Sequence, residues 1–514
     1  MDGDTGGDSA VTDSRLRSIV IVGGGTAGWM TAAALAKTLG NTCSIRLVES
    51  DDIGTVGVGE ATVPHLKAFN DALQIDEVDF LKAVQGTFKL GIQFCDWGRI
   101  GDKYIHGFGQ IGPEYGFLPF HQYWLKLRQM GKAADIGAYS IHTAAAPLGK
   151  FMTSASDVPP NSPLAHIAHA YHFDAGRYFL FLRNFAEARG VVRTEGQVTQ
   201  VQLKPENGFI DAVVLKSGER IEGDLFVDCS GFRGLLIEEA LHTGYESWQH
   251  WLPCDRALAV PCEAVGPPTP YTRSTARPAG WQWRIPLQHR VGNGYVYSSA
   301  HVSEDEAAST LLANLDGKPL ADPRLLKFVT GRRKKIWNKN CVAIGLSSGF
   351  LEPLESTSIY LIQSGVGRLI NLLPDRHCST VLAERYNQQA AFEFERIRDF
   401  IILHYHATDR RDSPFWQYCG TMSIPERLQE VIQLFLESGR FFRDADEMFA
   451  VTSWVQVLVG QNRVPTGYHP AVDLVGDEEL LQLESSVRGV IANCVKMMPA
   501  HEQFIARHCP APAA

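Results

Sequence analysis

Short apolar runs of strand length recur in the first two thirds of the chain, separated by small or polar residues. Residues 19–22 are apolar and β-branched, which is typical of a strand buried in a parallel sheet. Residues 30–39 have the Ala- and Leu-rich character of a helix, and residues 44–48 form a second apolar run. Two further apolar runs, 223–231 and 340–345, lead into small residues. The pattern predicts an α/β fold with a parallel sheet.

Helical periodicity dominates the last third of the chain. Residues 383–404 and 424–439 are long apolar-periodic segments. Pro-rich loops at 158–163 and 266–278 interrupt the strand-rich middle. We therefore expect a strand-rich unit followed by a mostly helical one.

The first predicted strand runs directly into the spacing Gly-x-Gly-x-x-Gly. Gly23 permits a tight turn, Gly25 lets a pyrophosphate approach the backbone, and Gly28 lets the helix pack closely on the strand. The helix N-terminus offers free N–H groups to phosphates. Glu49 follows where a carboxylate meets a ribose hydroxyl. This context indicates a dinucleotide site, and by itself it does not separate FAD from NAD(P).

Composition excludes several classes of protein. The chain has 514 residues with 48 Lys and Arg against 57 Asp and Glu, and this net charge of −9 does not suit nucleic acid or an anionic membrane as a partner. Ten cysteines without a C-x-x-C pair indicate thiols of a reducing compartment and no zinc site. His404 and His406 have no third ligand nearby, so we expect no metal site.

The N-terminal residues 1–16 are small, polar and acidic, which predicts a disordered tail. The apolar stretch 18–37 follows an acidic segment and is interrupted by three glycines, so a strand explains it better than a signal peptide. No run of 18 apolar residues suggests a transmembrane helix. We expect a cytoplasmic protein.

Three further segments narrow the choice of family. Residues 57–64 read GVGEATVP, residues 281–286 read WQWRIP, and residues 351–357 read LEPLEST. Together with GGGTAGWM at 23–30 they resemble the flavin-dependent halogenases of the tryptophan halogenase family, from about residue 17 to residue 470. G-x-G-x-x-G is shared with many flavoproteins, whereas W-x-W-x-I-P is characteristic of this family.

The resemblance implies a fold and a domain organisation. The core is an FAD-binding Rossmann-type unit of the kind with two dinucleotide halves, and the C-terminal module on the substrate side is mostly α-helical. The implied FAD-binding domain spans 17–370 and contains inserted substrate-site segments at about 86–175. The implied helical module spans 371–514.

The resemblance also implies a two-component enzyme. A separate NAD(P)H-dependent flavin reductase supplies FADH2, which reacts with O2 to a hydroperoxide that oxidises chloride or bromide to hypohalous acid. Lys89 matches the catalytic lysine, which delivers the oxidant to an electron-rich aromatic ring, and burial would disfavour its charged form. Glu355 matches the glutamate that stabilises the cationic ring and takes up its proton. Glu352 is expected to be an exposed loop residue.

The halide and flavin sites are carried over residue by residue. The halide would meet the backbone N–H groups of Thr357 and Ser358; the family commonly has glycine at the second place, and serine resists positive φ. Trp281 and Trp283 are expected to be structural parts of the flavin site. The residues expected to bind flavin are Gly23, Gly25, Thr26, Ala27, Gly28, Glu49, Ala61, Val198, Leu346 and Ile359.

The substrate end departs from the family. His106, Phe108 and Phe449 are expected to form aromatic walls around the substrate ring. Enzymes that act on free tryptophan carry a Tyr-Tyr pair and a glutamate, but this chain has Phe441 and Phe442. A site without those hydroxyl groups should discriminate poorly for the zwitterion, so we expect an indole-like substrate.

Three alternatives stay open. The enzyme would halogenate free L-tryptophan, or it would be a flavin-dependent monooxygenase, or the chain would be a flavoprotein without catalytic activity. The halide preference, the regiochemistry and a homodimer also stay open.

Overall fold

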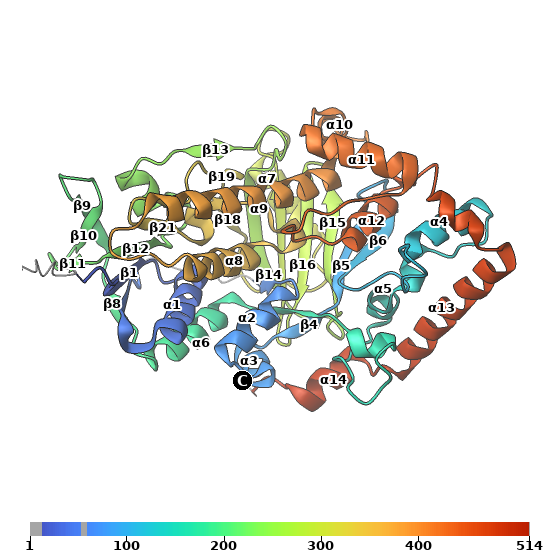
Figure 1. The fold of residues 1–514 in the computed structure, drawn as a ribbon, viewed down its shortest axis with the longest axis horizontal. Helices are drawn as coiled ribbons and strands as arrows, with labels where there is room; N and C mark the ends of the chain where they lie inside the picture. The colour runs from blue at the N-terminus through green and yellow to red at the C-terminus, as the bar shows by residue number, and fades with distance from the viewer. Residues whose placement is uncertain (1–12, 53–58, 513–514) are drawn as a thin grey trace, which may run out of the picture.

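The apolar runs near the N-terminus form the centre of a six-stranded sheet in the computed structural model, which describes residues 13–52 and 59–512 (Figure 1). Strand pairing is parallel except at β20, and every residue of β1 after the first is buried. The two later apolar runs form the strands β12 and β21, as predicted; β12 pairs with β1, and β21 pairs with β12. In spatial order the strands are β20 (Trp337–Asn338), β21 (Cys341–Ala343), β12 (Leu225–Asp228), β1 (Ser18–Val22), β2 (Ser44–Glu49) and β8 (Val192–Glu195).

Helix α1 (Thr26–Leu39) links β1 to β2 and begins four residues earlier than predicted. Gly25 is its N-cap, so Gly28 belongs to the first turn of the helix. Gly57 and Val58 of the predicted motif and residues 1–12 of the predicted tail lie outside the described residues.

A second, seven-stranded sheet forms the middle of the molecule (Figure 1). Its strands β15 and β5 pair in parallel although they lie far apart in the chain, and this places β6 at one edge. In spatial order the strands are β18 (Arg324–Lys327), β14 (Arg256–Cys262), β17 (Val291–Tyr297), β16 (Gly280–Pro286), β15 (Thr272–Arg277), β5 (Gly91–Cys95) and β6 (Lys103–Gly107).

Three smaller sheets complete the β structure. They are β3 (Gly59–Ala61), β7 (Ala170–Asp174) and β4 (Thr87–Lys89); β11 (Arg220–Glu222), β10 (Ile210–Leu215) and β9 (Val198–Leu203); and β13 (Tyr245–Ser247), β19 (Gly331–Arg333) and β22 (Gly349–Phe350).

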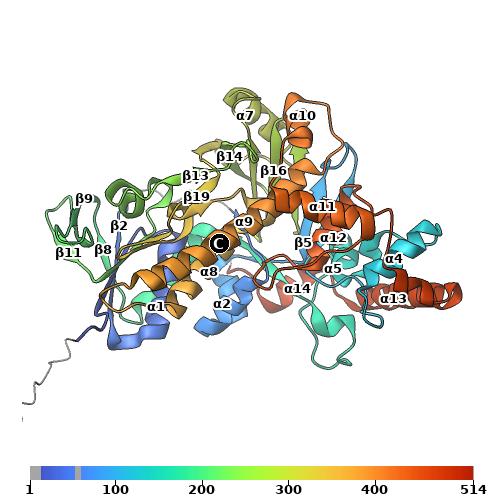
Figure 2. The same ribbon diagram turned by 45° about the horizontal axis from the view of Figure 1, so that its top comes forward.

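The long helix α9 (Thr380–His406) crosses the molecule from the parallel sheet toward the helical end, with α8 (Ser358–Asn371) beside it (Figure 1). It confirms the helix predicted at 383–404, and α11 (Glu426–Ser438) confirms the one at 424–439. Figure 2 shows α4 (Phe120–Gln129), α5 (Ile141–Ala145), α12 (Val451–Gly460) and α13 (Asp477–Met497) at this end, opposite β9 and β11.

The remaining helices are α2 (His65–Leu73), α3 (Glu77–Val84), α6 (Ala175–Glu187), α7 (Glu304–Ala313), α10 (Pro414–Thr421) and α14 (His501–His508). Among residues 13–52 and 59–512, no helix is long and apolar enough to cross a membrane. The mixed α/β architecture with a helical C-terminal region agrees with the expected fold class. The predicted domain boundaries stay a prediction.

Candidate functional site

The glycine turn after β1 shapes one end of a cavity. Gly23 has a φ of 115°, and a Cβ there would lie 2.2 Å from the carbonyl oxygen of Cys229. A Cβ on Gly28 would lie 1.8 Å from the carbonyl oxygen of Gly23. At Gly25 a Cβ would meet no atom within 4 Å. Two glycines therefore allow close packing, and the third leaves open space beside the N-terminus of α1, where a phosphate can approach.

This cavity has a volume of about 510 Å³ and is lined by both large sheets and the start of α8. Gly28 packs against the carbonyl oxygen of Gly23 and is not among the residues that line the cavity, and Leu346 is partly exposed. The glycine cradle, the helix N-terminus and the apolar walls fit a flavin dinucleotide. The predicted flavin residues that line the cavity are Gly23, Gly25, Thr26, Ala27, Glu49, Ala61, Val198, Leu346 and Ile359.

Glu49 reaches the cavity at the end of β2 and is held from three sides. Its carboxylate accepts hydrogen bonds from Arg193 and, at 3.3 Å, from Nε1 of Trp29. Arg183 lies 3.8 Å away. The two arginines come from β8 and α6, and no local pattern around Glu49 identified them. They fix the carboxylate at the position expected to meet a ribose hydroxyl.

Lys89 is fully buried at the end of β4. Its Nζ donates hydrogen bonds to the carbonyl oxygen of Thr62 at 2.9 Å and to Oγ of Ser356 at 2.8 Å, and it lies 5.3 Å from the ring centre of Phe108. Burial lowers the pKa of Lys89 to about 7, although Glu355 acts in the opposite direction. A substantial fraction of this amine is therefore neutral near pH 7.

Glu355 is buried within reach of two imidazoles. His106 Nδ1 lies 2.9 Å from Oε2, and His404 Nε2 lies 2.8 Å from Oε1. Burial opposes ionisation, but the two histidines outweigh it and lower the pKa of Glu355 to about 2. The carboxylate is therefore charged at neutral pH, beside a lysine that Ser356 connects to the same loop.

His404 has a role that sequence reasoning missed. The sequence analysis considered His404 and His406 only as metal ligands and expected no metal site there. In the structure His404 Nδ1 lies 2.8 Å from the carbonyl oxygen of Phe400, which fixes the ring with its other nitrogen toward Glu355. The available sequence signal was the apolar run 400–403 directly before His404 on a predicted helix, which indicates packing against a core; in the structure residues 397–405 are all buried.

The predicted halide residues lie at the N-terminus of α8. Thr357 is the N-cap and Ser358 is the first helical residue, which lines the cavity. The positive φ of 58° occurs at Ser356, so the concern about serine at position 358 does not apply. Thr357 Oγ1 is buried without a hydrogen-bond partner among the described residues. Free N–H groups and the helix dipole favour an anion here.

The aromatic residues of the predicted substrate site lie together. The rings of His106 and Phe449 are 6.3 Å apart and tilted by 50°. Phe449 stacks on Phe400 at 3.9 Å, and Trp454 meets Phe400 edge-on at 4.9 Å. Phe400 and Trp454 were missed because each lies on a helix whose buried face is indistinguishable in sequence from ordinary core.

The expectation that Glu352 is exposed is wrong. Its side chain is fully buried, and Oε2 accepts hydrogen bonds from Trp281 Nε1 at 3.0 Å and from the hydroxyl of Tyr405. Oε1 has no hydrogen-bond partner in the described part of the chain. Trp281 and Trp283 both line the cavity, with ring centres 6.1 Å apart. Glu352 therefore connects the W-x-W-x-I-P strand to α9 next to His404.

All ten cysteines are buried free thiols. In the described ranges 13–52 and 59–512, no group of three or more His, Cys, Asp or Glu side chains is arranged to hold a metal ion.

Comparisons with known proteins agree with this geometry. A family model described as tryptophan halogenase matches residues 18–477. Tryptophan 6-halogenase SttH of Streptomyces toxytricini is 35% identical over 95% of this chain and 97% of its own length. Tryptophan 7-halogenase RebH of Lentzea aerocolonigenes is 32% identical over 96% and 98%.

Solved structures give closer matches. A flavin-dependent halogenase from Xanthomonas campestris is 50% identical with a TM-score of 0.94, covering 97% of this chain and 100% of that one. BrvH, a flavin-dependent halogenase from Brevundimonas sp. BAL3, is 48% identical with a TM-score of 0.93, over 97% and 100%.

Proposed function

Since the chain belongs to the tryptophan halogenase family, we propose that it halogenates an indole-like aromatic ring in preference to free tryptophan. The enzyme is a flavin-dependent halogenase, which uses FADH2, O2 and chloride or bromide. Enzymes of this family take their reduced flavin from a separate reductase and act on an aromatic substrate.

The observation that carries the proposed roles is that one buried site lowers both pKa values, which favours the neutral form of Lys89 and the charged form of Glu355. Two groups whose protonation states are set by their environments in this way take different parts in acid–base chemistry. A neutral Lys89 has two N–H groups, which match its two oxygen partners, and its lone pair is then free to meet hypohalous acid. Bound reduced flavin and O2 supply the oxidising equivalent for the halide.

Glu355 acts on the ring. Its ionised carboxylate stabilises the positive charge that develops during electrophilic substitution, and it accepts the proton that the ring loses. His106 and His404 keep it ionised and fix its orientation. The halide would meet the N–H groups of Thr357 and Ser358, two and three positions after the glutamate.

The flavin is held by the residues of the cavity. The N-terminus of α1 would meet the diphosphate, and the carboxylate of Glu49 would accept a hydrogen bond from a ribose hydroxyl. Further contacts come from Gly25, Thr26, Ala27, Ala61, Val198, Leu346 and Ile359.

The preference for an indole-like compound rests on the residues beside the aromatic walls. Phe441 is buried and stacks on Trp454 with ring centres 4.8 Å apart, so it supplies apolar surface and no hydrogen bond. Phe442 is 72% exposed. Neither side chain can meet an ammonium or carboxylate with a hydroxyl group. Halogenation of free L-tryptophan is the alternative, because several relatives are named tryptophan 6- or 7-halogenase.

One experiment tests the proposal. The protein is incubated with FAD, a flavin reductase, NADH, O2 and bromide or chloride, with indole and L-tryptophan in equal amounts. We expect halogenated indole as the main product by mass spectrometry. Lys89→Ala should abolish halogenation and retain FAD binding, whereas the exposed control Lys103→Ala should leave both unchanged.

Other products would contradict the proposal in different ways. Halogenated tryptophan as the main product would refute the substrate preference. A gain of one oxygen would indicate a monooxygenase. Halogenation of a fixed ring position by Lys89→Ala would remove Lys89 from the mechanism.

A further inference from the structure

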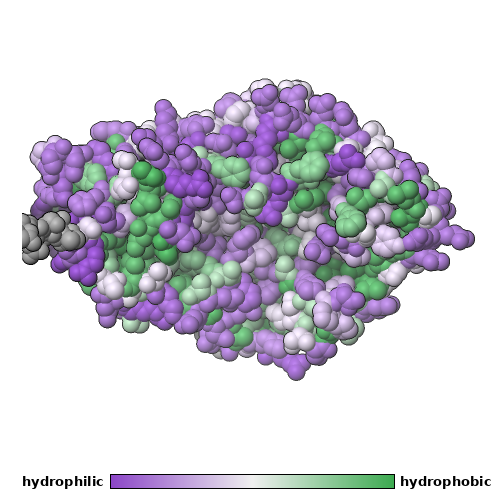
Figure 3. All heavy atoms as spheres, viewed as in Figure 1, coloured by the Kyte–Doolittle hydropathy of each residue, from purple (hydrophilic) through white to green (hydrophobic). Residues whose placement is uncertain are grey.

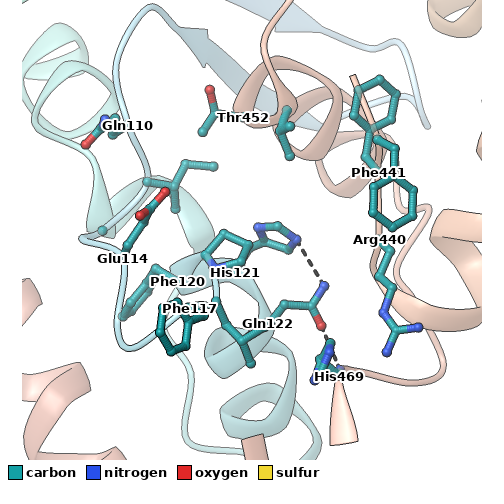
Figure 4. A pocket seen from close by; sticks show the side chains of 16 residues that line it. Gln110, Glu114, Phe117, Phe120, His121, Gln122, Arg440, Phe441, Thr452 and His469 are labelled. Atoms are coloured by element: carbon teal, nitrogen blue, oxygen red, sulfur yellow. Dashed lines mark hydrogen bonds between the residues drawn. The ribbon is translucent and has the colours of Figure 1, made fainter. Parts of the chain in front are cut away.

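A second cleft opens at the helical end of the molecule, next to the aromatic walls of the substrate site. It has a volume of about 630 Å³ and lies between the segment that follows Phe108 and the connection from α11 to α12 (Figure 4). Phe117 is fully exposed and Phe442 is 72% exposed on its walls. Figure 3 shows apolar side chains on this face where α4 and α12 lie.

A column of aromatic rings connects this cleft to Glu355. Phe441 lines the cleft and stacks on Trp454 at 4.8 Å. Trp454 meets Phe400 at 4.9 Å, and Phe400 stacks on Phe449, which faces His106. These buried rings form a wall between the cleft and the ring site. Gln110 and Val451 of the cleft each follow an aromatic residue of the ring site, Phe108 and Phe449, by two positions, so a substituent that passes the edge of this wall would enter the cleft.

The backbone that carries Arg440 is held by buried polar side chains. The carbonyl oxygen of Gly439 accepts hydrogen bonds from His121 Nε2 at 2.9 Å and Gln122 Nε2 at 2.6 Å. The amide oxygen of Gln122 in turn accepts from the backbone N–H of His469 at 2.8 Å (Figure 4). His121 and Gln122 are both buried, so these bonds are shielded from water. They fix the position from which Arg440 projects.

The charge of Arg440 is not used within the protein. Its guanidinium has no ion pair or hydrogen bond to any residue that the structure describes, although Arg440 is half-buried. Figure 4 places Glu114 on the opposite side of the cleft from Arg440. A guanidinium presents parallel N–H groups that match a carboxylate in a bidentate pair.

We propose that this cleft binds the tail of the substrate, and that the substrate is an electron-rich ring on a flexible apolar chain that ends in a carboxylate. The inference rests on the proposed function, because the ring must reach Lys89 and Glu355. The chain packs against Phe117 and Phe442, and the carboxylate pairs with Arg440. This class differs from free tryptophan, which carries an ammonium next to its carboxylate, because the positive charge of Arg440 repels an ammonium close to it.

The test compares indole, indole-3-butyrate, its methyl ester and tryptamine as substrates. We expect indole-3-butyrate to have a kcat/KM about 10- to 100-fold above that of the ester, because a charge-assisted bidentate pair is lost in the ester. Arg440→Gln should remove this advantage mainly through KM and change kcat/KM for indole less than twofold. Arg507→Gln on α14, an exposed arginine without an ion pair in the described chain, is the control.

A binding measurement separates this inference from the proposed function. Titration calorimetry with indole-3-butyrate and with its ester needs no turnover, so it tests the cleft even if no halogenation occurs. Equal affinity for acid and ester, unchanged binding in Arg440→Gln, or a preference for tryptamine would each overturn the inference. If indole is halogenated but Arg440→Gln does not change the kinetics or the binding of indole-3-butyrate, the tail-binding inference is wrong and the proposed function stands.

Discussion

The buried carboxyl of Glu352 makes a testable contribution to stability. It lies three positions before Glu355, the proposed catalytic glutamate, and accepts hydrogen bonds from Trp281 and Tyr405 on one oxygen only. Burial raises its pKa to about 7 from 4.5, and the two hydrogen bonds act in the opposite direction without cancelling this. The nearby thiols of Cys254 and Cys419 stay protonated, because burial raises their pKa values further.

The sign of the pH dependence follows from the raised pKa. Below pH 4.5 the carboxyl is protonated in the folded and unfolded chain alike, so the stability is complete. Between pH 4.5 and 7 the unfolded chain releases the proton and the folded chain keeps it, so the free energy of unfolding falls. Above pH 7 the loss levels off at roughly 3 kcal/mol, from about 1.4 kcal/mol for each pH unit between the two pKa values.

Glu352→Gln isolates this contribution, because the amide has the same shape and its oxygen still accepts both hydrogen bonds. Thermal and urea unfolding at pH 5 and pH 8.5 should show that the wild type loses about 3 kcal/mol more than the variant. The exposed Glu502→Gln on α14 should behave like the wild type. Parallel pH profiles of wild type and Glu352→Gln would refute a raised pKa for this carboxyl.

Two shorter predictions concern the imidazole contact and the glycine turn. His404→Gln should lower kcat for indole at least tenfold in steady-state assays, because His404 orients Glu355. Glu355→Gln should lower kcat more, by roughly 10²- to 10⁴-fold. Equal activity of His404→Gln and wild type would contradict the proposed role of His404. Gly25→Val should weaken FAD binding at least tenfold in a flavin fluorescence titration without lowering Tm, because the new side chain enters open space. Gly28→Val should lower Tm, because its Cβ would lie 1.8 Å from a carbonyl oxygen.

Local sequence patterns predicted the strands and the helix that form the proposed flavin site. The strand–glycine–helix order around Gly23 is a property of consecutive residues, and so is the apolar character of β12 and β21. Helix α1 nevertheless begins earlier than expected, because the small residues after Gly25 showed no apolar period although they are helical. Strand neighbours and helix starts depend on contacts that no local window contains.

The side chains that contact Glu355 and Glu352 could not be predicted from local sequence patterns. Glu355 meets His106 across 249 positions of the chain, and it meets His404 from a different helix. Glu352 looked like a loop residue because Pro353 follows it, yet Trp281 and Tyr405 enclose it from distant elements. Glu355 and His106 were predicted only because they match family motifs. His404 and Tyr405 lie outside those motifs, and nothing in the sequence around them indicated these contacts.

One backbone feature explains how three consecutive residues serve three purposes. Ser356 has a φ of 58°, which costs a non-glycine residue about 1–3 kcal/mol, and α8 begins two residues later. Because the chain turns sharply there, Glu355 faces the histidines, Ser356 faces Lys89, and Thr357 begins the helix end suited to an anion. A regular helix or strand would direct these side chains along its own period, and the carboxylate, the amine and the halide could not meet at one point. The strain at Ser356 thus brings together the groups on which the proposed reaction depends.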